Sequence, residues 1–502
     1  MKRFLISAIV SMTCFMAQAH EIIIPVVNIA PGGEKSVNVT LPTIPDGANF
    51  TAFQFDIKGL PAGVSLKDAA MNGSPTTRVV KFGSVTVNNA TNYRVLSYDT
   101  QNTSLTENDV LTLTLAADAN AAVGENEADV ETALVVTPAG VTADANNDFA
   151  INVKGKLDVE IKSSLRTTLV SGFDLDFSSV EGLNAYIVTG YDKSTSEIWM
   201  TRVTEAPAGT PVLLKGTSAK QYEIPTTTSH TYLPENFLKG YADADIPLDK
   251  SGKYNNLTLK SGKFVAIDEE EVDFPAGKCY LQVPTTIPSA TGTALSLNMK
   301  NGKKAYIGKY DLDFTGLDTE GLKAYTVTGY KNGTIMMSSV KKVSKGTPLY
   351  IIGTANKAYT VPSVAAQAVY ANMLCGDADN DIALTMTKDG FTNFVMKGGQ
   401  FSPLPEDDPE FPAGTAYLPV PTSYLAAATS RGDFEKFQFT EMESEVISMK
   451  LGSLDGEDGT TGIRELMNGV ESDVWYNLKG QRIDTPTKKG LYILNGKKVV
   501  VK

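Results

Sequence analysis

The chain carries two copies of one sequence pattern, and this self-similarity limits its architecture more than any other feature. Ala-Tyr-Ile-Val-Thr-Gly-Tyr at 185–191 returns as Ala-Tyr-Thr-Val-Thr-Gly-Tyr at 324–330. Phe-Pro-Ala-Gly at 274–277 returns at 411–414, an offset of 137 residues (414 − 277). Solenoid repeats have periods of roughly 20 to 50 residues, so this longer spacing leaves each copy enough chain for a core of its own.

The two copies predict two tandem domains, 156–296 and 297–441, and we expect residues 297–441 to fold alone. The copies share mainly Gly, Pro, aromatic and branched aliphatic residues, which set turns and fill a pleated core. Short runs such as Pro-Val-Leu-Leu at 211–214 and Tyr-Leu-Gln-Val at 280–283 are rich in strand-forming residues and lack a sustained 3.6-residue period. Both domains are therefore predicted to be all-β, with sandwich and barrel left open.

Residues 20–155 belong to neither copy and show a clearer strand pattern. In the run Val-Leu-Thr-Leu-Thr-Leu, strict alternation places Leu111, Leu113 and Leu115 on one face and the threonines on the other. Phe-Gln-Phe-Asp-Ile at 53–57 alternates in the same way, and Gly, Pro and Asn separate the runs. A span of this length with this pattern predicts one β-sandwich.

The N-terminus has the composition of a secretory signal. Lys2 and Arg3 precede a short apolar run and an Ala-Gln-Ala site that ends at Ala19. We expect residues 1–19 to be a cleaved signal peptide, so that the mature chain begins at His20 and is secreted or held at the outer cell surface.

Cys14 offers an alternative to simple cleavage, because a cysteine near a signal peptide can carry a lipid anchor. The Met-Thr pair before it lacks the small residue usual at such sites, so we favour the signal peptide. After residue 19 no run approaches the ~18 consecutive apolar residues of a membrane span, so no span is expected in the mature chain.

Nucleophilic and metal-dependent chemistry have few candidate residues. Cys279 and Cys375 lack the C-x-x-C spacing of a zinc or redox site, and we interpret them as two small buried hydrophobes, with a disulfide between them as the alternative. Histidine is limited to His20 and His230, so a Ser-His-Asp or Cys-His site would lack its base. No catalytic residue, cofactor or metal ligand is predicted.

Acidic clusters in the chain have part of the spacing of a calcium loop. Asp377, Asp379 and Asp381 begin such a loop, but Ile382 stands where the loop needs Gly and Lys388 where it needs Glu. We therefore interpret these side chains as turn caps rather than calcium ligands. The same partial spacing occurs in the other copy and in the N-terminal segment, at Asp243 and Asp245 and at Asp144, Asn146 and Asp148, the last followed by Phe149 in place of Gly.

Two further patterns carry a weaker functional hypothesis. Asp174 and Asp176, like Asp311 and Asp313 in the second copy, would share one strand face, as either a solvated edge or a glycosidase pair does. Two acids two residues apart are common on strands, so we favour the structural interpretation. Arg-Gly-Asp at 431–433 matches an adhesion tripeptide, but so short a motif arises often by chance.

The strand runs of residues 20–155 resemble a known module. The runs are, in order, Ser-Val-Asn-Val-Thr at 36–40, Phe-Gln-Phe-Asp at 53–56, Leu-Pro-Ala-Gly-Val at 60–64, Val-Leu-Ser-Tyr at 95–98 and Asp-Val-Leu-Thr-Leu-Thr-Leu at 109–115. This order resembles cohesin and related carbohydrate-binding sandwiches. The resemblance implies a jelly-roll that binds a dockerin partner or, in relatives, a polysaccharide. It identifies no partner-binding residue at a given position of this chain, so the ligand-binding residues stay unknown.

Residues 442–502 are predicted to form a linker and a C-terminal β segment. The acidic, Gly-rich run at 454–459 is typical of a linker, and Asn495-Gly496 between two apolar runs is typical of a type I′ hairpin. The end of the chain resembles C-terminal sorting domains of Bacteroidetes secreted proteins, although it is shorter. The tandem copies resemble repeats in surface and secreted proteins of Bacteroides and Prevotella relatives.

These observations predict a function in binding rather than catalysis. With 45 Lys and Arg against 57 Asp and Glu, the formal charge of −12 argues against a nucleic-acid partner. We expect a non-catalytic secreted or cell-surface protein that recognises a polysaccharide or a protein through its β modules, mapping first to residues 20–155 and independent of metal. The alternative is a secreted glycan-active enzyme whose carboxylate pair comes from distant strands.

Overall fold

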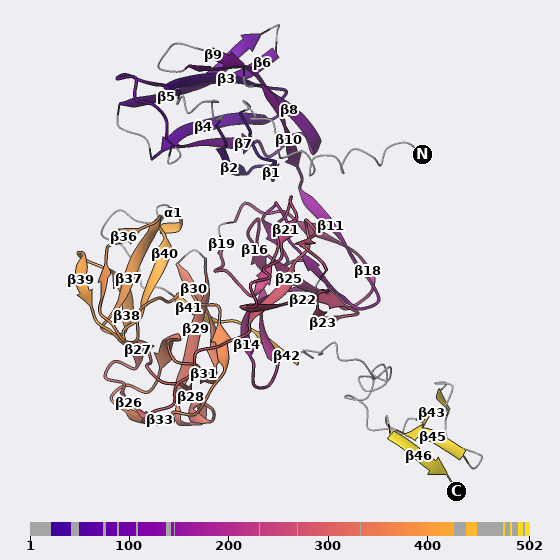
Figure 1. The fold of residues 1–502 in the computed structure, drawn as a ribbon, viewed down its shortest axis with the longest axis vertical. Helices are drawn as coiled ribbons and strands as arrows, with labels where there is room; N and C mark the ends of the chain where they lie inside the picture. Colours follow the sequence, from indigo (N-terminus) through magenta and orange to yellow (C-terminus); the bar gives the residue numbers. More distant parts are fainter. Residues whose placement is uncertain are drawn as a thin grey trace. The chain divides into compact units, whose positions relative to one another are not determined.

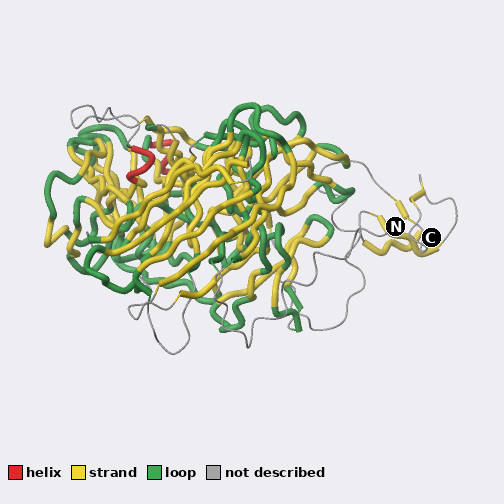
Figure 2. The backbone as a smooth tube through the Cα atoms, turned by 90° about the horizontal axis from the view of Figure 1, so that it is seen from above, coloured by secondary structure: helices red, strands yellow, loops and turns green. Residues whose placement is uncertain are grey.

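In a computed structural model of the chain, the regular secondary structure is almost entirely β-strand, which confirms the all-β prediction (Figures 1 and 2). The chain divides into two compact units, residues 1–451 and 452–502, and each is described by itself. No helix within the described residues has the length and apolar character needed to cross a membrane. The structure describes residues 22–41, 50–73, 77–87, 90–106, 109–136, 142–144, 146–229, 231–268, 270–331, 333–425, 438–448, 475–476, 482–483, 490–494 and 497–501.

Several sequence predictions fall outside these residues. They concern the signal peptide at 1–19 with Cys14, His20, His230, the Arg-Gly-Asp tripeptide at 431–433, the linker run at 454–459 and the turn residues Asn495 and Gly496.

Residues 22–153 form a two-sheet sandwich, as predicted. The larger sheet has the order β1(Val27–Ile29), β10(Asn147–Val153), β8(Gly124–Val136), β3(Ala52–Lys58), β6(Ala90–Asp99), β5(Arg78–Val87), with β9(Thr142–Asp144) also paired to β8. The smaller sheet has the order β2(Glu34–Val39), β7(Val110–Ala117), β4(Val64–Asn72).

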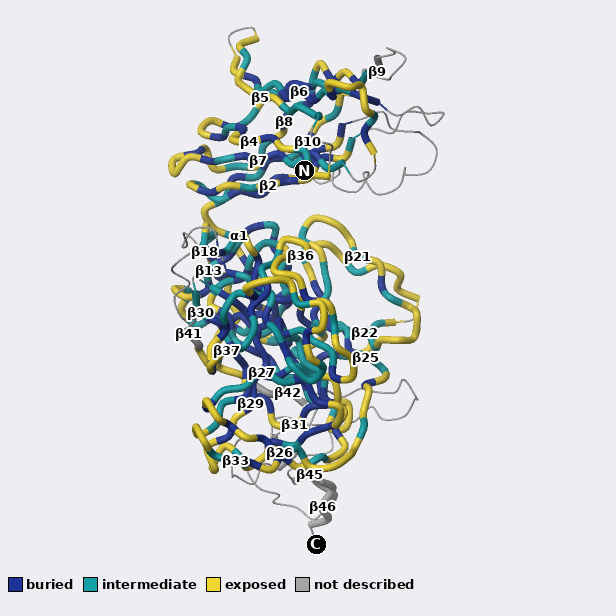
Figure 3. Tube along the Cα trace, turned by 90° about the vertical axis from the view of Figure 1, so that its left-hand side faces the viewer, coloured by how far each residue is buried: buried dark blue, intermediate teal, exposed yellow. Residues whose placement is uncertain are grey.

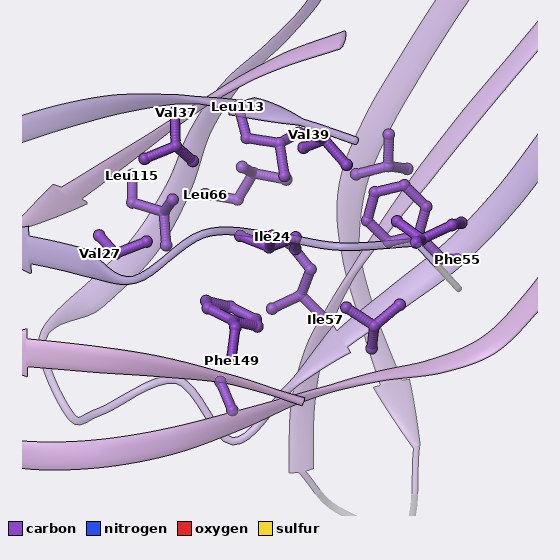
Figure 4. Close-up of a cluster of buried hydrophobic side chains, with 14 of the residues drawn as sticks. Ile24, Val27, Val37, Val39, Phe55, Ile57, Leu66, Leu113, Leu115 and Phe149 are labelled. Carbon is purple, nitrogen blue, oxygen red and sulfur yellow. The ribbon is translucent and has the colours of Figure 1, made fainter. Parts of the chain in front are cut away.

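One cluster of apolar side chains fills the space between these two sheets (Figure 4). Leu111, Leu113 and Leu115 of β7 are fully buried while the intervening residues are only half-buried, so the predicted alternation is confirmed. Phe55 and Ile57 of β3 meet them from the opposite sheet. At about 25 cal/mol per Å² of buried apolar surface, such side chains contribute most of the stability of a domain this size.

Each tandem copy is built in three layers around a central sheet. In the first copy that sheet has the order β12(Arg166–Leu169), β17(Val212–Gly216), β14(Leu183–Asp192), β15(Glu197–Val203), β42(Ser444–Ser448). One face is covered by β11(Lys156–Ile161) paired with β18(Lys220–Pro225) and by β13(Leu175–Asp176) paired with β16(Glu205–Ala206). The other face is covered by β20(Leu238–Lys239), β25(Tyr280–Pro284), β22(Tyr254–Lys260) and β23(Lys263–Ala266), near the pair β21(Ile246–Pro247) and β24(Asp273–Phe274).

The second copy repeats most of this arrangement. Its central sheet has the order β27(Lys303–Ile307), β32(Pro348–Ile352), β29(Lys323–Lys331), β30(Thr334–Val340), β41(Gln438–Glu441). The covering strands are β26(Leu295–Asn298), β33(Ala358–Val361), β28(Leu312–Asp313), β31(Lys342–Val343), β35(Ile382–Leu384), β36(Thr387–Lys388), β37(Phe391–Lys397), β38(Gln400–Pro403), β39(Asp408–Phe411) and β40(Tyr417–Pro421), with a 3-10 turn at Leu317–Glu320 and α1(Thr422–Leu425).

The central strands are buried on both faces, so each copy is a layered sandwich and not a barrel. In β14, Ala185 and Ile187 pack on one side of the sheet, while Tyr186 and Val188 pack on the other. A strand covered on both faces reads as a continuous apolar run, which explains why Ala-Tyr-Ile-Val shows no alternation. Buried residues accordingly concentrate in the interior of the tandem (Figure 3).

The two copies exchange equivalent strands. β34(Ala368–Tyr370) of the second copy pairs with Gly190, Tyr191 and Asp192 at the end of β14 in the first. Reciprocally, β19(Thr231–Tyr232) of the first copy pairs with the end of β29 in the second. Each central sheet is therefore completed by a strand from the other copy.

The repeated Val-Thr-Gly-Tyr signature lies at this junction. A side chain at Gly190 would meet a ring carbon of Trp199 at 2.7 Å and one of Tyr370 at 2.9 Å. The threonines join a buried chain of hydroxyls across the copies, Thr189 to Thr201 at 2.7 Å, Thr201 to Ser338 at 2.9 Å and Ser338 to Thr328 at 3.4 Å. The signature thus specifies the contact between copies as well as the fold of each.

The segment 438–448 follows the second copy and joins both central sheets. β41 runs parallel to β30 of the second copy, and β42 runs antiparallel to β15 of the first. Between them, Met442 N–H donates to Met337 O at 2.8 Å and Arg202 N–H donates to Glu443 O at 2.9 Å. β42 lies within the predicted segment 442–502, so the first part of that segment is a strand of the tandem.

The second unit contains a four-stranded sheet with the order β44(Arg482–Ile483), β43(Trp475–Tyr476), β45(Gly490–Leu494), β46(Lys497–Val501). β45 and β46 pair antiparallel with Leu494 opposite Lys497, which confirms the predicted hairpin. Its role in sorting stays a prediction.

Candidate functional site

The outer face of the larger sandwich sheet is the strongest candidate site, and strand register fixes which side chains share it. Directly paired residues of neighbouring strands point to the same face. Across β8, β3, β6 and β5 the pairing defines three rows. The rows are Val136, Ala52, Tyr98 and Val79; Leu134, Gln54, Leu96 and Lys81; and Glu131, Asp56, Arg94 and Gly83.

The first two rows carry partly exposed apolar side chains on the outer surface of the sheet. Leu134 is 43% exposed, and Leu96, Tyr98, Val79 and Val136 are each half-buried. Single exposed apolar residues are normal on protein surfaces, but a contiguous group on one flat face marks an interaction surface.

The third row is a fixed ionic group beside the apolar rows. Arg94 binds Asp56 through two hydrogen bonds, Nε to Oδ1 at 2.7 Å and Nη2 to Oδ2 at 2.8 Å. The Asp56 side chain is only 3% exposed, whereas that of Arg94 is 41% exposed. Hydrogen bonding to Asp56 raises the pKa of the Arg94 guanidinium. The arginine is therefore fixed in position and presents a permanently charged edge to solvent.

Lys58 and Glu131 continue the charged side of the face. Lys58 Nζ lies 2.7 Å from Glu131 Oε1 and 3.8 Å from Asp129 Oδ2. The hydrogen bond to Glu131 raises the pKa of Lys58. Both side chains are more than 40% exposed, so the pair adds little to stability and is available to a partner.

A β-bulge in β8 sets the register that places Leu134 in the face. The pairing of β3 with β8 shifts between Gln54 and Asp56, and Thr132 has a positive φ of 49°. Asn146 Oδ1 accepts a hydrogen bond from Ala133 N–H at 3.0 Å and so holds the bulge. Asn146 belongs to the run that has part of the spacing of a calcium loop, and its side chain stabilises the bulge in β8.

The loop after β6 closes one end of the face. The Asp99 carboxylate accepts hydrogen bonds from Thr77 Oγ1 at 2.6 Å, Gln101 N–H at 2.7 Å and Thr103 N–H at 3.0 Å. The hydrogen bond from Thr77 is the largest cause of the lowered pKa of Asp99, which is about 2. Arg78 donates to Thr51 O and Thr103 O, which ties this loop to β3 and β5.

The acids retained in the two copies cap turns, as interpreted from the sequence. Asp245 Oδ1 accepts from Ala276 N–H and Asp381 Oδ1 accepts from Ala413 N–H, each at 2.8 Å, so equivalent acids hold the two Phe-Pro-Ala-Gly turns. Asp377 accepts from the N–H groups of Asp379 and Asn380, and these bonds lower its pKa. The remaining members lie apart: Asp379 is 3.6 Å from Lys309, and Asp243 accepts from Asn28 at 3.1 Å.

Backbone N–H groups also donate hydrogen bonds to the aspartates of the two Asp-Leu-Asp runs. Asp174 accepts from Ala208 N–H at 2.6 Å, and its equivalent Asp311 accepts from Lys345 N–H at 2.8 Å. Burial would raise the pKa of Asp311, but bonds from Ser289, Ala366, Ala290 and Lys345 hold it below its usual value. Asp176 and Asp313 accept from the N–H groups two residues on. These carboxylates act as structural acceptors.

The two cysteines are free thiols, and the interpretation as small buried hydrophobes is confirmed for Cys279 but not for Cys375. Cys279 is fully buried, and burial raises the pKa of its thiol to about 12. Cys375 is half-buried, and burial raises its pKa as well. Within the described part of the chain, no group of three or more His, Cys, Asp and Glu side chains is placed to hold a metal ion.

The sequence analysis named no ligand-binding residue, but the sequence of β6 contains a pattern that indicates this face. In Val-Leu-Ser-Tyr at 95–98, Val95 is buried while Leu96 and Tyr98 stand in the opposite phase. A strand of a two-sheet sandwich that carries large apolar residues in both phases has an apolar outer surface. The partners of that surface on β8 and β5 depend on pairing over long sequence distances, which one sequence does not show.

Comparison with solved structures finds similarity to cohesin modules. A cohesin module from a Clostridium perfringens family 33 glycoside hydrolase is 15% identical, with 28% of this chain and 100% of that chain covered and a TM-score of 0.22. A Clostridium thermocellum cohesin, solved in a cohesin–dockerin complex, is 17% identical over 27% of this chain and 98% of that chain, with a TM-score of 0.23.

A T6 backbone pilin of Streptococcus pyogenes is 10% identical, with 68% of this chain and 61% of that chain covered and a TM-score of 0.14. No family model and no curated protein matches the chain. The similarity to the two cohesin modules extends over 27 to 28% of the chain.

Proposed function

We propose that the chain is a non-catalytic binding protein whose N-terminal sandwich docks a protein partner on the outer face of its larger sheet. One observation carries the proposal: strand register aligns two rows with exposed apolar side chains beside a row held by the Asp56–Arg94 ion pair. Specific protein interfaces combine such an apolar centre with a polar rim, and Tyr and Arg are enriched in them.

The geometry suits a folded protein better than a small ligand. The face is a surface of paired strands, and its residues line none of three cavities in the described residues, with volumes of about 590, 540 and 310 Å³. Small ligands need concave pockets that bury most of their surface, whereas protein partners bind flat faces. The Clostridium thermocellum cohesin forms a complex with a dockerin, which is a protein. We infer that the partner of this sandwich is likewise a protein.

Export belongs to the same proposal. The basic start, the short apolar run and the Ala-Gln-Ala site support cleavage before His20 and a secreted or outer-surface location. N-terminal sequencing of protein recovered from outside the cell should begin at His20. A mature chain starting at a lipidated Cys14 would contradict that part of the proposal.

The docking face is tested with charge substitutions and a matched control. Leu96→Asp and Leu134→Asp each place a charge in the apolar rows, whereas Val123→Asp makes the same kind of change at a 67% exposed position outside the face. Partners found by cross-linking of the exported full-length protein should then be purified and their affinities measured. We expect each face variant to weaken binding by about 2 kcal/mol or more, as truncation of a central contact does, and Val123→Asp to leave it unchanged.

Thermal melting of each variant separates loss of binding from loss of folding. Equal affinities for the face variants and the control, with all of them folded, would contradict the docking face. Hydrolysis of a glycan by the purified full-length protein would contradict the non-catalytic assignment.

A further inference from the structure

The first tandem copy contains an open cavity that the docking proposal does not use. Its volume is about 590 Å³, and it lies between the edge strands β11 and β12, the strand β22 and the Phe-Pro-Ala-Gly turn. This volume is within the range of sites for small ligands. Six of its lining residues carry the argument: Asp158, Glu160, Lys162, Arg166, Phe274 and Lys278.

Three cations converge on this cavity in a chain of net charge −12. Among the described residues, none of Lys162, Arg166 and Lys278 forms an ion pair with a carboxylate. The Arg166 guanidinium donates to the carbonyl of Gly262 at 2.8 Å, and Lys278 Nζ reaches Thr168 O at 3.3 Å and Thr167 Oγ1 at 3.4 Å. Their charges are therefore available to an anionic ligand.

The second copy provides an internal reference for these residues. Strand pairing places Asp158 and Glu160 of β11 at the positions of Ser296 and Asn298 of β26, since Val159 faces Tyr222 as Leu297 faces Tyr359. In the repeated turn, Lys278 follows Phe-Pro-Ala-Gly where the second copy has Thr415. The fold accepts neutral residues at these three positions, so folding alone does not require the charges of Asp158, Glu160 and Lys278.

The remaining lining indicates a carbohydrate. Asp158 and Glu160 supply carboxylate acceptors for hydroxyl groups, and the half-buried Phe274 supplies an apolar surface for the C–H face of a sugar ring. The β12 wall is closed to an added peptide strand, because Lys278 Nζ already contacts Thr168 O and Val170 N–H donates to Gly277 O at 3.0 Å. β11 pairs only with β18 among the described strands, so an acidic peptide remains the competitor that an experiment must test.

We propose that this cavity of the first copy binds an acidic oligosaccharide, one that carries carboxylate or sulfate groups. The cations hold the anionic groups, the two carboxylates accept hydroxyl hydrogens, and Phe274 contacts a ring face. This site is independent of the sandwich docking face.

The test uses the exported full-length protein and defined probes in isothermal titration calorimetry. The probes are a galacturonate tetramer, its neutral methyl ester, a heparin-derived tetrasaccharide and an octaglutamate peptide. The variant Lys278→Thr introduces the residue of the second copy, and Lys388→Thr makes the same change at an exposed lysine of that copy. We expect an acidic saccharide to bind, with about tenfold weaker binding to Lys278→Thr and an unchanged affinity in Lys388→Thr, the size expected for one charge-assisted hydrogen bond.

Failure of both acidic saccharides to bind would overturn the proposal. So would equal affinities for Lys278→Thr and Lys388→Thr, or a galacturonate tetramer that binds no more tightly than a methyl ester that also binds. Octaglutamate binding that depends on Lys278 in the absence of saccharide binding would assign the cavity to a peptide instead. Melting curves establish that Lys278→Thr is folded, and Asp158→Ser, the other second-copy residue, gives an independent variant with an expected loss of affinity.

Discussion

The sandwich and the tandem copies close their cores in different ways. In the sandwich, a single apolar cluster lies between two sheets whose described strands all belong to residues 22–153. In the tandem, Val369 of the second copy packs on a cluster of the first, and Tyr232 of the first packs on a cluster of the second. The comparison teaches that a sequence repeat marks the unit that was duplicated, whereas the unit that folds is set by where strands pair and cores close.

The largest expected effect concerns the second copy in isolation. The repeat predicts that residues 297–441 fold alone, whereas the exchange of strands leads us to expect that isolation destabilises them. Without residues 156–296 the end of β29 loses its pairing with β19, and Tyr232 no longer covers its cluster. We expect residues 297–441 to be at least about 3 kcal/mol less stable than the same copy within 156–448, since both apolar burial and hydrogen bonds are lost.

Thermal melting of the two fragments at low concentration measures this difference, with sedimentation to confirm that each is monomeric. Equal melting temperatures would break the comparison, because the second copy would then close its core as independently as the sandwich does.

Gly190→Val should destabilise the junction between the copies. The added side chain would meet Trp199 and the exchanged Tyr370 at distances that require one of them to move. Overpacking of this kind costs about 1–3 kcal/mol. We expect the melting transition of both copies to shift together while that of the sandwich stays in place. Gly155→Val is the matched control, because a Cβ added at Gly155 meets nothing within 4 Å. A shift confined to the first copy would show that the junction does not couple the two.

The hydroxyl chain offers a smaller and more specific measurement. Thr201→Val and Ser338→Ala each remove one partner of a buried hydrogen bond between the copies. In a double-mutant cycle we expect a coupling of about 0.5–1.5 kcal/mol, the net value of one buried hydrogen bond. A coupling near zero would mean that the two hydroxyls contribute separately and that strand pairing alone joins the copies.

Acid should affect the sandwich through Asp99, which is the smallest of these effects. The pKa of Asp99 is lowered from 3.8 to about 2, first by the hydrogen bond from Thr77. A carboxyl with a lowered folded pKa stabilises the protein above its unfolded pKa, and this contribution is lost as the pH falls through the folded pKa. We therefore expect Asp99→Asn to remove a part of the sandwich stability at pH 5 that the wild type loses between about pH 4 and pH 2. Melting temperatures of both proteins at pH 5, 3 and 2 test this, and an unchanged difference at all three pH values would contradict it.

Much of the fold followed from local patterns. The alternation of Leu111, Leu113 and Leu115 predicted a half-buried strand because one face of a sandwich strand meets water. The matching strand order of the copies followed from their shared Gly, Pro and aromatic residues.

What the sequence did not predict depends on contacts between distant residues. The three layers of each copy were hidden because Ala-Tyr-Ile-Val in β14 is buried on both faces, and such a run has no period. The exchange was hidden because the same residues Val-Thr-Gly-Tyr fit a turn or a close approach of strands. The candidate face depends on the pairing of Leu134 with Gln54, 80 positions apart (134 − 54), and on a bulge that shifts its register.

The segment 438–448 has a mechanical consequence. It connects the tandem to the C-terminal unit, so tension from an attachment beyond residue 448 reaches β42 before any other strand of the tandem. β42 pairs with β15 over five residues, and a pull along its axis loads those hydrogen bonds together in shear rather than one after another. Because β41 continues the same segment on β30, the load is then divided between the two central sheets. A chain anchored at its C-terminus would thus carry its binding surfaces on a tether that resists flow first through the first copy, at β42, and then through the second copy, at β41.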